Sequence, residues 1–152
     1  MRRLVAILEN IRSAENVGSI FRTADATGFS KVYLAGFTPT PLQHKVKKTS
    51  LGAENFVAWE KSGRTTSLIK KLKGKGFFVV ALEQHKLGRN LFAFKKKKGN
   101  IALVVGNEIK GISKNTLKSA DAIVEIPMSG KKESLNVAVA FGIAAYFLKE
   151  LS

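Results

Sequence analysis

Three segments of the chain carry polar side chains and glycines at spacings that could do chemistry. The first spans residues 9–25 and contains Arg12, Asn16 and Arg22. A helix that begins at Asn16 would hold Arg22 within two turns of its start, with Arg12 in the loop before it. Planar donors beside a helix N-terminus suit a phosphate or a ribose hydroxyl. A capped surface helix with two solvated arginines explains the same residues equally well.

The second segment, residues 105–113, superficially matches a phosphate-binding P-loop because it has two suitably spaced glycines. Ile112 and Ser113 replace the Lys-Ser/Thr pair that should follow the second glycine, which argues against a triphosphate site. The third glycine of a dinucleotide fingerprint is also missing, which argues against a nucleotide-cofactor oxidoreductase. Two glycines around the carboxylate of Glu108 still indicate that the backbone approaches something closely. An ordinary glycine-rich turn is the simpler interpretation.

The third segment, residues 126–137, leads from an apolar run through Pro127 to Ser134 and Asn136. An N-cap at Ser134 or Asn136 is the simpler interpretation of these two polar residues. The helix that follows is apolar nearly all round. It must therefore be buried on more than one side, either in the core or across a subunit interface.

The rest of the chain predicts a scaffold that brings these segments together. Strands that alternate with helices favour an α/β fold, a parallel sheet flanked by helices, in which ligands bind at the carboxyl ends of the strands. Gly28 is expected to close the first helix in the left-handed conformation. Residues 36–60 hold no period and predict a functional loop with some local structure. The expected strands are residues 4–8, 31–35, 77–82, 101–105 and 122–126, and the expected helices are residues 16–28, 65–73, 113–117 and 134–148.

Charge and composition narrow the class of protein. The chain has 152 residues, with 26 Lys and Arg against 11 Asp and Glu, and a net charge of +15. Such a surplus favours polyanions as partners, nucleic acid first and an anionic membrane second. Cysteine is absent and there are two histidines, so we expect no disulfide, thiolate catalysis or metal centre. No apolar run has the length of a membrane span or a secretory signal, so we expect one cytoplasmic domain over residues 1–152.

The ordered set of segments resembles the SpoU (TrmH-type) RNA ribose methyltransferases of the SPOUT superfamily. The motifs that carry the resemblance are NIRSAENVGSIFRTAD (residues 10–25), GNEIKG (residues 106–111), and IPM (residues 126–128) through SLN (residues 134–136). They occur in family order, and the resemblance covers essentially the whole chain. It implies a parallel sheet whose C-terminal third forms a deep trefoil knot, an exception to the rule that chains do not thread loops. It also implies a homodimer with the active site at the interface, which the apolar last helix favours.

The resemblance further implies a reaction, the transfer of a methyl group from S-adenosylmethionine (SAM) to a ribose 2′-hydroxyl of RNA. Arg22 matches the catalytic arginine of the family. Because an arginine is effectively always protonated, we expect Arg22 to stabilise the developing alkoxide or to hold the adjacent phosphate. The other polar positions that shape the site are Asn16, Glu108, Ser134 and Asn136. The implied SAM-binding residues are Leu82, Gly106, Ile126, Met128 and Leu135.

Family members often carry an N-terminal RNA-binding domain or helical extensions, and this sequence shows neither. We therefore expect the catalytic domain itself to capture RNA, with tRNA favoured as the substrate and rRNA as the alternative. Phe37, Phe56 and Trp59 could stack on unpaired bases. For any one lysine cluster a solvated face is the simpler interpretation, whereas the total charge favours a polyanion. The candidate RNA-binding residues are Arg12, Lys45, Lys47, Lys48, Lys95, Lys96 and Lys97.

A different class of function is a non-catalytic RNA-binding or ribosome-assembly module on a degenerate methyltransferase scaffold. The two classes differ in whether the catalytic-type residues remain. Arg22, Glu108, Ser134 and Asn136 are all present, which favours the enzyme.

Overall fold

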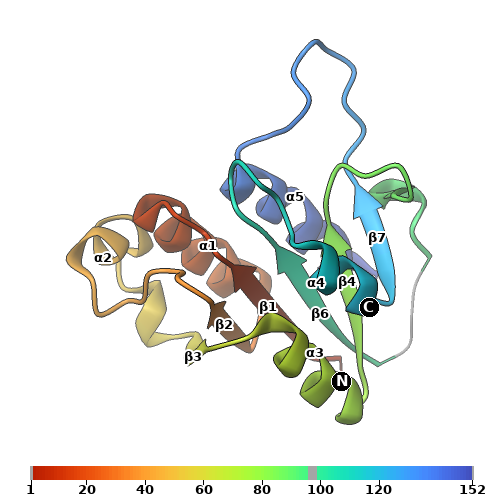
Figure 1. The fold of residues 1–152 in the computed structure, drawn as a ribbon. Helices are drawn as coiled ribbons and strands as arrows, with labels where there is room; N and C mark the ends of the chain where they lie inside the picture. Colours follow the sequence, from red (N-terminus) through yellow and green to blue (C-terminus); the bar gives the residue numbers. More distant parts are fainter. Residues whose placement is uncertain (1, 96–98, 152) are drawn as a thin grey trace.

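The computed structural model describes residues 2–95 and 99–151, and within them one sheet has the strand order β3-β2-β1-β6-β4-β7-β5 (Figure 1). Every strand pairing in this sheet is parallel. The predicted α/β fold, a parallel sheet flanked by helices, is confirmed, and the trefoil knot stays a prediction. The strands are β1 (Leu4–Glu9), β2 (Lys31–Ala35), β3 (Ala58–Ser62), β4 (Phe77–Leu82), β5 (Arg89–Asn90), β6 (Asn100–Val105) and β7 (Ala122–Glu125).

Helices cover both faces of the sheet. Successive side chains of a strand point to opposite faces, so each strand contributes side chains to both sides. Leu4, Ala6 and Leu8 of β1 pack in an apolar cluster with α1 and α5, whereas Val5 and Ile7 pack in a second cluster with α3. Burial of both faces agrees with the nearly continuous apolar runs of the central strands. The helices are α1 (Ala14–Thr27), α2 (His44–Ser50), α3 (Thr65–Gly74), α4 (Lys114–Ser119) and α5 (Val137–Glu150), with short 3-10 turns at Ala53–Asn55 and Leu91–Ala93.

Two helices begin at other residues than the sequence predicts. The N-cap of α1 is Ser13, whose hydroxyl accepts a hydrogen bond from the Asn16 N–H, so Asn16 lies in the first turn and is not the cap. The N-cap of α5 is Asn136, which leaves Ser134 in the preceding loop. In both cases the residue with extended backbone and a free side-chain oxygen takes the cap position. The end of α1 is as predicted, with Gly28 at a φ of 76°.

Residues 36–60 contain more regular structure than the predicted loop. They hold α2, a 3-10 turn and the first residues of β3. β3 is absent from the predicted strands because this edge strand is polar and half-exposed, without the apolar run of the central strands. The helix α2 packs directly on α1 at Gly18, where a Cβ atom would collide with the Val46 carbonyl.

The order of the strands determines where the polar loops meet. β1, β6, β4 and β7 are consecutive neighbours and all run in the same direction, so their carboxyl ends lie along one edge of the sheet. This is the edge at which parallel sheets bind ligands. Among the described residues, no helix has the length and apolar character needed to cross a membrane.

Candidate active site

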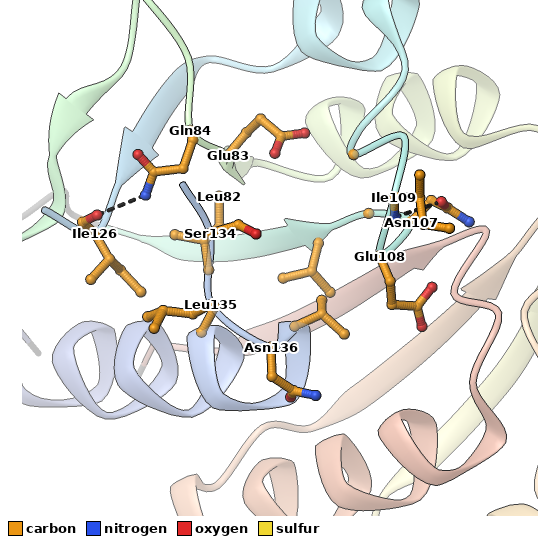
Figure 2. Close-up of a pocket in the computed structure, with 15 residues that line it drawn as sticks. Leu82, Glu83, Gln84, Asn107, Glu108, Ile109, Ile126, Ser134, Leu135 and Asn136 are labelled. Atoms are coloured by element: carbon orange, nitrogen blue, oxygen red, sulfur yellow. Dashed lines mark hydrogen bonds between the residues drawn. The ribbon is translucent and has the colours of Figure 1, made fainter. Parts of the chain in front are cut away.

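A cavity of about 370 Å³ lies at the carboxyl edge of the sheet. Its wall combines the ends of β4, β6 and β7, the loop that follows each of them, and the first turn of α5 (Figure 2). Of the predicted site residues, seven line this cavity: Leu82, Gly106, Glu108, Ile126, Ser134, Leu135 and Asn136.

The carboxylate of Glu108 is held by donors from the first sequence motif. Its Oε2 accepts the Arg12 N–H at 3.0 Å, and its Oε1 accepts the Ser13 N–H at 3.1 Å and the Asn16 side-chain amide at 3.2 Å. Burial raises the pKa of Glu108, but these hydrogen bonds together outweigh burial and leave the pKa below its ordinary value of 4.5. Glu108 is therefore ionised at neutral pH.

Asn16 connects Glu108 to the start of α5. Its Oδ1 accepts a hydrogen bond from Nδ2 of Asn136 at 3.1 Å, while its own Nδ2 donates to Glu108. The Oδ1 of Asn136 caps α5 by accepting the N–H groups of Ala138 and Val139. The N-cap interpretation of Asn136 is thus confirmed, and the same side chain also joins the first and third motifs. The chain Glu108–Asn16–Asn136 links all three motifs at one wall of the cavity.

The turn that presents Glu108 is built by Asn107. Its Oδ1 accepts the N–H groups of Ile109 and Lys110, both at 2.9 Å, and its Nδ2 donates to the carbonyl of Asn10 at 2.8 Å. Asn10 itself has a φ of 54°, a left-handed conformation that asparagine tolerates better than most residues. These contacts tie the turn after β6 to the turn after β1.

The two glycines of the second motif, Gly106 and Gly111, lie close to other residues of the same chain. A Cβ at Gly106 would meet the Ile112 N–H, and a Cβ at Gly111, whose φ is 70°, would overlap the carboxylate of Glu83. That carboxylate accepts the Ile112 N–H at 2.5 Å. Burial dominates and raises the pKa of Glu83 above its ordinary value of 4.5, although the backbone hydrogen bonds oppose it. The close approach expected from the glycines is therefore between neighbouring loops.

Glu83 and Gln84 line the cavity, and the sequence analysis assigned neither of them. The Nε2 of Gln84 donates to the Ile126 carbonyl at 2.7 Å, which ties the end of β4 to the end of β7 (Figure 2). Their position directly after an apolar strand was the available signal, because the carboxyl ends of parallel strands form the ligand-binding edge.

Arg22 and Met128 are not among the residues that line the cavity. Arg22 is exposed on α1, six residues beyond Asn16. Six residues turn a helix by about 600° and advance it by about 9 Å, so Arg22 leaves α1 in a direction well away from Asn16. The structure of one chain therefore does not bring the predicted catalytic arginine to Glu108.

The predicted RNA-binding residues separate into two groups. Arg12 and Lys45 line a second groove that adjoins the cavity. Lys47 and Lys48 are exposed on α2 outside this groove, and Lys95 is exposed after the Leu91–Ala93 turn. Lys96 and Lys97 lie outside the described residues.

A parallel sheet with polar loops around a cavity at its carboxyl edge is typical of α/β proteins that bind a ligand at that edge. Within that class, the chain belongs to the SpoU rRNA Methylase family, whose model matches residues 3–146.

Individual relatives agree with this family. The chain is 34% identical to an uncharacterized tRNA/rRNA methyltransferase of Mycobacterium tuberculosis, over 95% of this chain and 51% of that protein. It is similar to an AdoMet-bound rRNA methyltransferase of Sinorhizobium meliloti, with a TM-score of 0.92, 28% identity, and coverage of 97% and 56% of the two chains. A solved structure concerned with the 2-OH methylation of C/U34 on tRNA has a TM-score of 0.86, 26% identity, and coverage of 99% and 96%. The chain spans about half the length of the curated relatives that it matches.

Proposed function

We propose that the protein transfers the methyl group of SAM to a ribose 2′-hydroxyl of RNA, with tRNA favoured over rRNA. The observation that carries this proposal is the hydrogen-bonded chain Glu108–Asn16–Asn136, which joins the three motifs beside the cavity. The AdoMet-bound relative and the relative concerned with 2-OH methylation of tRNA support the cofactor and the reaction.

The residues around the cavity fit SAM. Leu82, Val105 and Leu135 offer apolar surface to an adenosine, and Glu108 offers an ionised carboxylate to a cation. When bound, SAM supplies an electrophilic methyl group on a sulfonium. The contribution of the chain is to hold the ribose oxygen in line with that methyl group and to stabilise its negative charge.

Arg22 is proposed as the group that stabilises the developing alkoxide or the neighbouring phosphate. Because Arg22 lies outside the cavity of its own chain, we propose a homodimer in which Arg22 reaches the cavity of the partner copy. Val139 and Tyr146 of α5 are 52% and 49% exposed, an apolar face that such a dimer would cover. An Arg22→Ala variant should lose methyl transfer and retain SAM binding, and loss of SAM binding would contradict this role.

Basic residues supply the affinity for RNA in this proposal. The net charge of +15 favours a polyanion, and Arg12, Lys45, Lys47, Lys48 and Lys95 are all exposed. We further propose that residues 1–152 form one SpoU-type unit and that its C-terminal part carries the family's knot.

The deciding experiment measures the transfer of labelled methyl from SAM to small RNA and, separately, to ribosomal RNA, followed by digestion to nucleosides. A labelled 2′-O-methyl nucleoside from one pool supports the reaction and identifies the substrate class. A label on a base contradicts the ribose assignment. Absence of SAM binding in calorimetry would instead favour the non-catalytic RNA-binding scaffold.

A further inference from the structure

A second groove, of about 1150 Å³, adjoins the cavity. The two share the turn after β6, because Asn107, Glu108, Ile109 and Gly111 line both of them. A molecule that enters this groove therefore lies next to whatever occupies the cavity.

The groove lining combines three cations with three carboxylates. Arg12, Lys45 and Lys110 line it and are exposed. Of the carboxylates in its wall, Glu9 is 5% exposed and accepts the Ser113 N–H, and Glu108 is occupied by the donors described above. Glu15 is the third carboxylate and is exposed, so the lining has as many carboxylates as cations, and the positive charge of Arg12 and Lys45 acts locally.

Phe37 places an aromatic ring in this groove, although the ring is 60% exposed. The backbone before the ring is held close to Asn10. The Phe37 N–H donates to Oδ1 of Asn10 at 3.0 Å, and the preceding Gly36 has a φ of 61° and so little space that a Cβ would overlap the same oxygen. The main-chain carbonyl of Asn10 also accepts Nδ2 of Asn107, so two hydrogen bonds connect the Phe37 backbone to the residue that precedes Glu108.

We infer that this groove seats an unpaired nucleotide of the RNA, adjacent to the nucleotide that is methylated, with its base stacked on Phe37 and its phosphate held by Arg12 and Lys45. The inference rests on the proposed function and adds that the RNA is single-stranded where it occupies this groove. An exposed aromatic ring beside cations binds single strands, because the face of an unpaired base is free to stack. In a duplex both faces of the base are already stacked, and Phe37 would have no partner.

The test measures binding of a single-stranded RNA decamer that contains 2-aminopurine, and of the same decamer annealed to its complement, both without SAM. The wild-type protein should bind the single strand more tightly and quench its fluorescence. Phe37→Ala should weaken single-strand binding about tenfold and abolish the quenching, whereas Phe37→Trp should retain both. Phe92→Ala is the matched control, since Phe92 is 55% exposed but does not line this groove.

The inference is overturned if Phe37→Ala binds the single strand as the wild type does, or if the duplex binds equally tightly. It is also overturned if Phe37→Ala changes the molar mass of the protein in solution and not its RNA affinity, because the groove would then be a contact between copies. Methyl transfer and SAM binding are measured separately, so a failure of the inference with intact transfer leaves the proposed function standing.

Discussion

The side chains of Asn16 and Asn136 are joined by a hydrogen bond of 3.1 Å, although they lie 120 positions apart in the sequence. Asn16 lies in α1, the helix after β1, and Asn136 is the N-cap of α5, the last helix. Through this contact and the bond from Asn16 to Glu108, the candidate site connects both halves of the chain.

Replacement of Glu108 by Gln should lower the free energy of unfolding at neutral pH. It should also reduce the loss of that free energy as the pH falls. An amide has one acceptor oxygen, so it cannot serve the three donors that Glu108 binds, and we expect a loss of about 1 kcal/mol at pH 7. Because folding lowers the pKa of Glu108 below 4.5, its contribution is present at neutral pH and is lost as the pH falls through the folded-state pKa. Urea unfolding of the wild type and the variant at pH 7 and pH 3 measures the difference between their free energies of unfolding. This difference should be smaller at pH 3.

Glu83→Gln should have the opposite pH dependence. Folding raises the pKa of Glu83 above 4.5, so the wild type loses stability as the pH rises from 4.5 through the folded-state pKa. The amide oxygen of Gln still accepts the Ile112 N–H without the cost of burying a charge. The free energy of unfolding of the variant, relative to the wild type, should therefore be greater at pH 7 than at pH 4. A constant difference between the two pH values would contradict the raised pKa.

Gly36→Ala should destabilise the protein by about 2 kcal/mol or more. Alanine disfavours the φ of 61°, and its Cβ would overlap Oδ1 of Asn10. Gly63→Ala is the matched control, because a Cβ at Gly63 meets nothing within 4 Å. Thermal unfolding of the two variants should separate them clearly, and equal midpoints would exclude the close approach of Gly36 to Asn10.

Gln84→Ala should loosen the segment between β7 and α5. The variant loses the bond from Gln84 to the Ile126 carbonyl, which is worth about 1 kcal/mol. Hydrogen exchange should become faster in residues 126–136 and remain unchanged in β1. If SAM binds this cavity, calorimetry should also show a weaker affinity for the cofactor.

A mixture of Arg22→Ala and Glu108→Ala chains tests the proposed dimer. Each variant alone should be inactive in methyl transfer. If Arg22 acts on the partner's cavity, half of the dimers in an equal mixture are mixed and each has one complete site, which gives about a quarter of wild-type activity. No recovery after confirmed subunit exchange would mean that the Arg22 and Glu108 of one site come from the same chain.

The central strands and the loops of the site were predictable because each has a strong local pattern. The run Leu4–Leu8 is apolar without interruption, and Gly28 ends a helix in the expected left-handed conformation. β3 was not predictable from its polar edge sequence. The pairing of Asn16 with Asn136 was also beyond local patterns, since a hydrogen bond between distant positions depends on the arrangement of the whole sheet. The residue types near the start of α1 favoured Asn16 as the N-cap. In the structure Ser13 is the N-cap, because its hydroxyl accepts the Asn16 N–H.

The pairing of β1 with β6 has a consequence for how the protein is made. Leu4 lies opposite Ile101, so β1 gains its second neighbour only after β6 has been synthesised. Contacts between such distant positions slow folding, and during synthesis the open edge of β1 is available to other strands. The Asn16–Asn136 contact must form later still. Because Glu108 follows β6 and Asn136 follows β7, a nascent chain that has emerged only as far as β6 lacks two of the three residues that join the motifs.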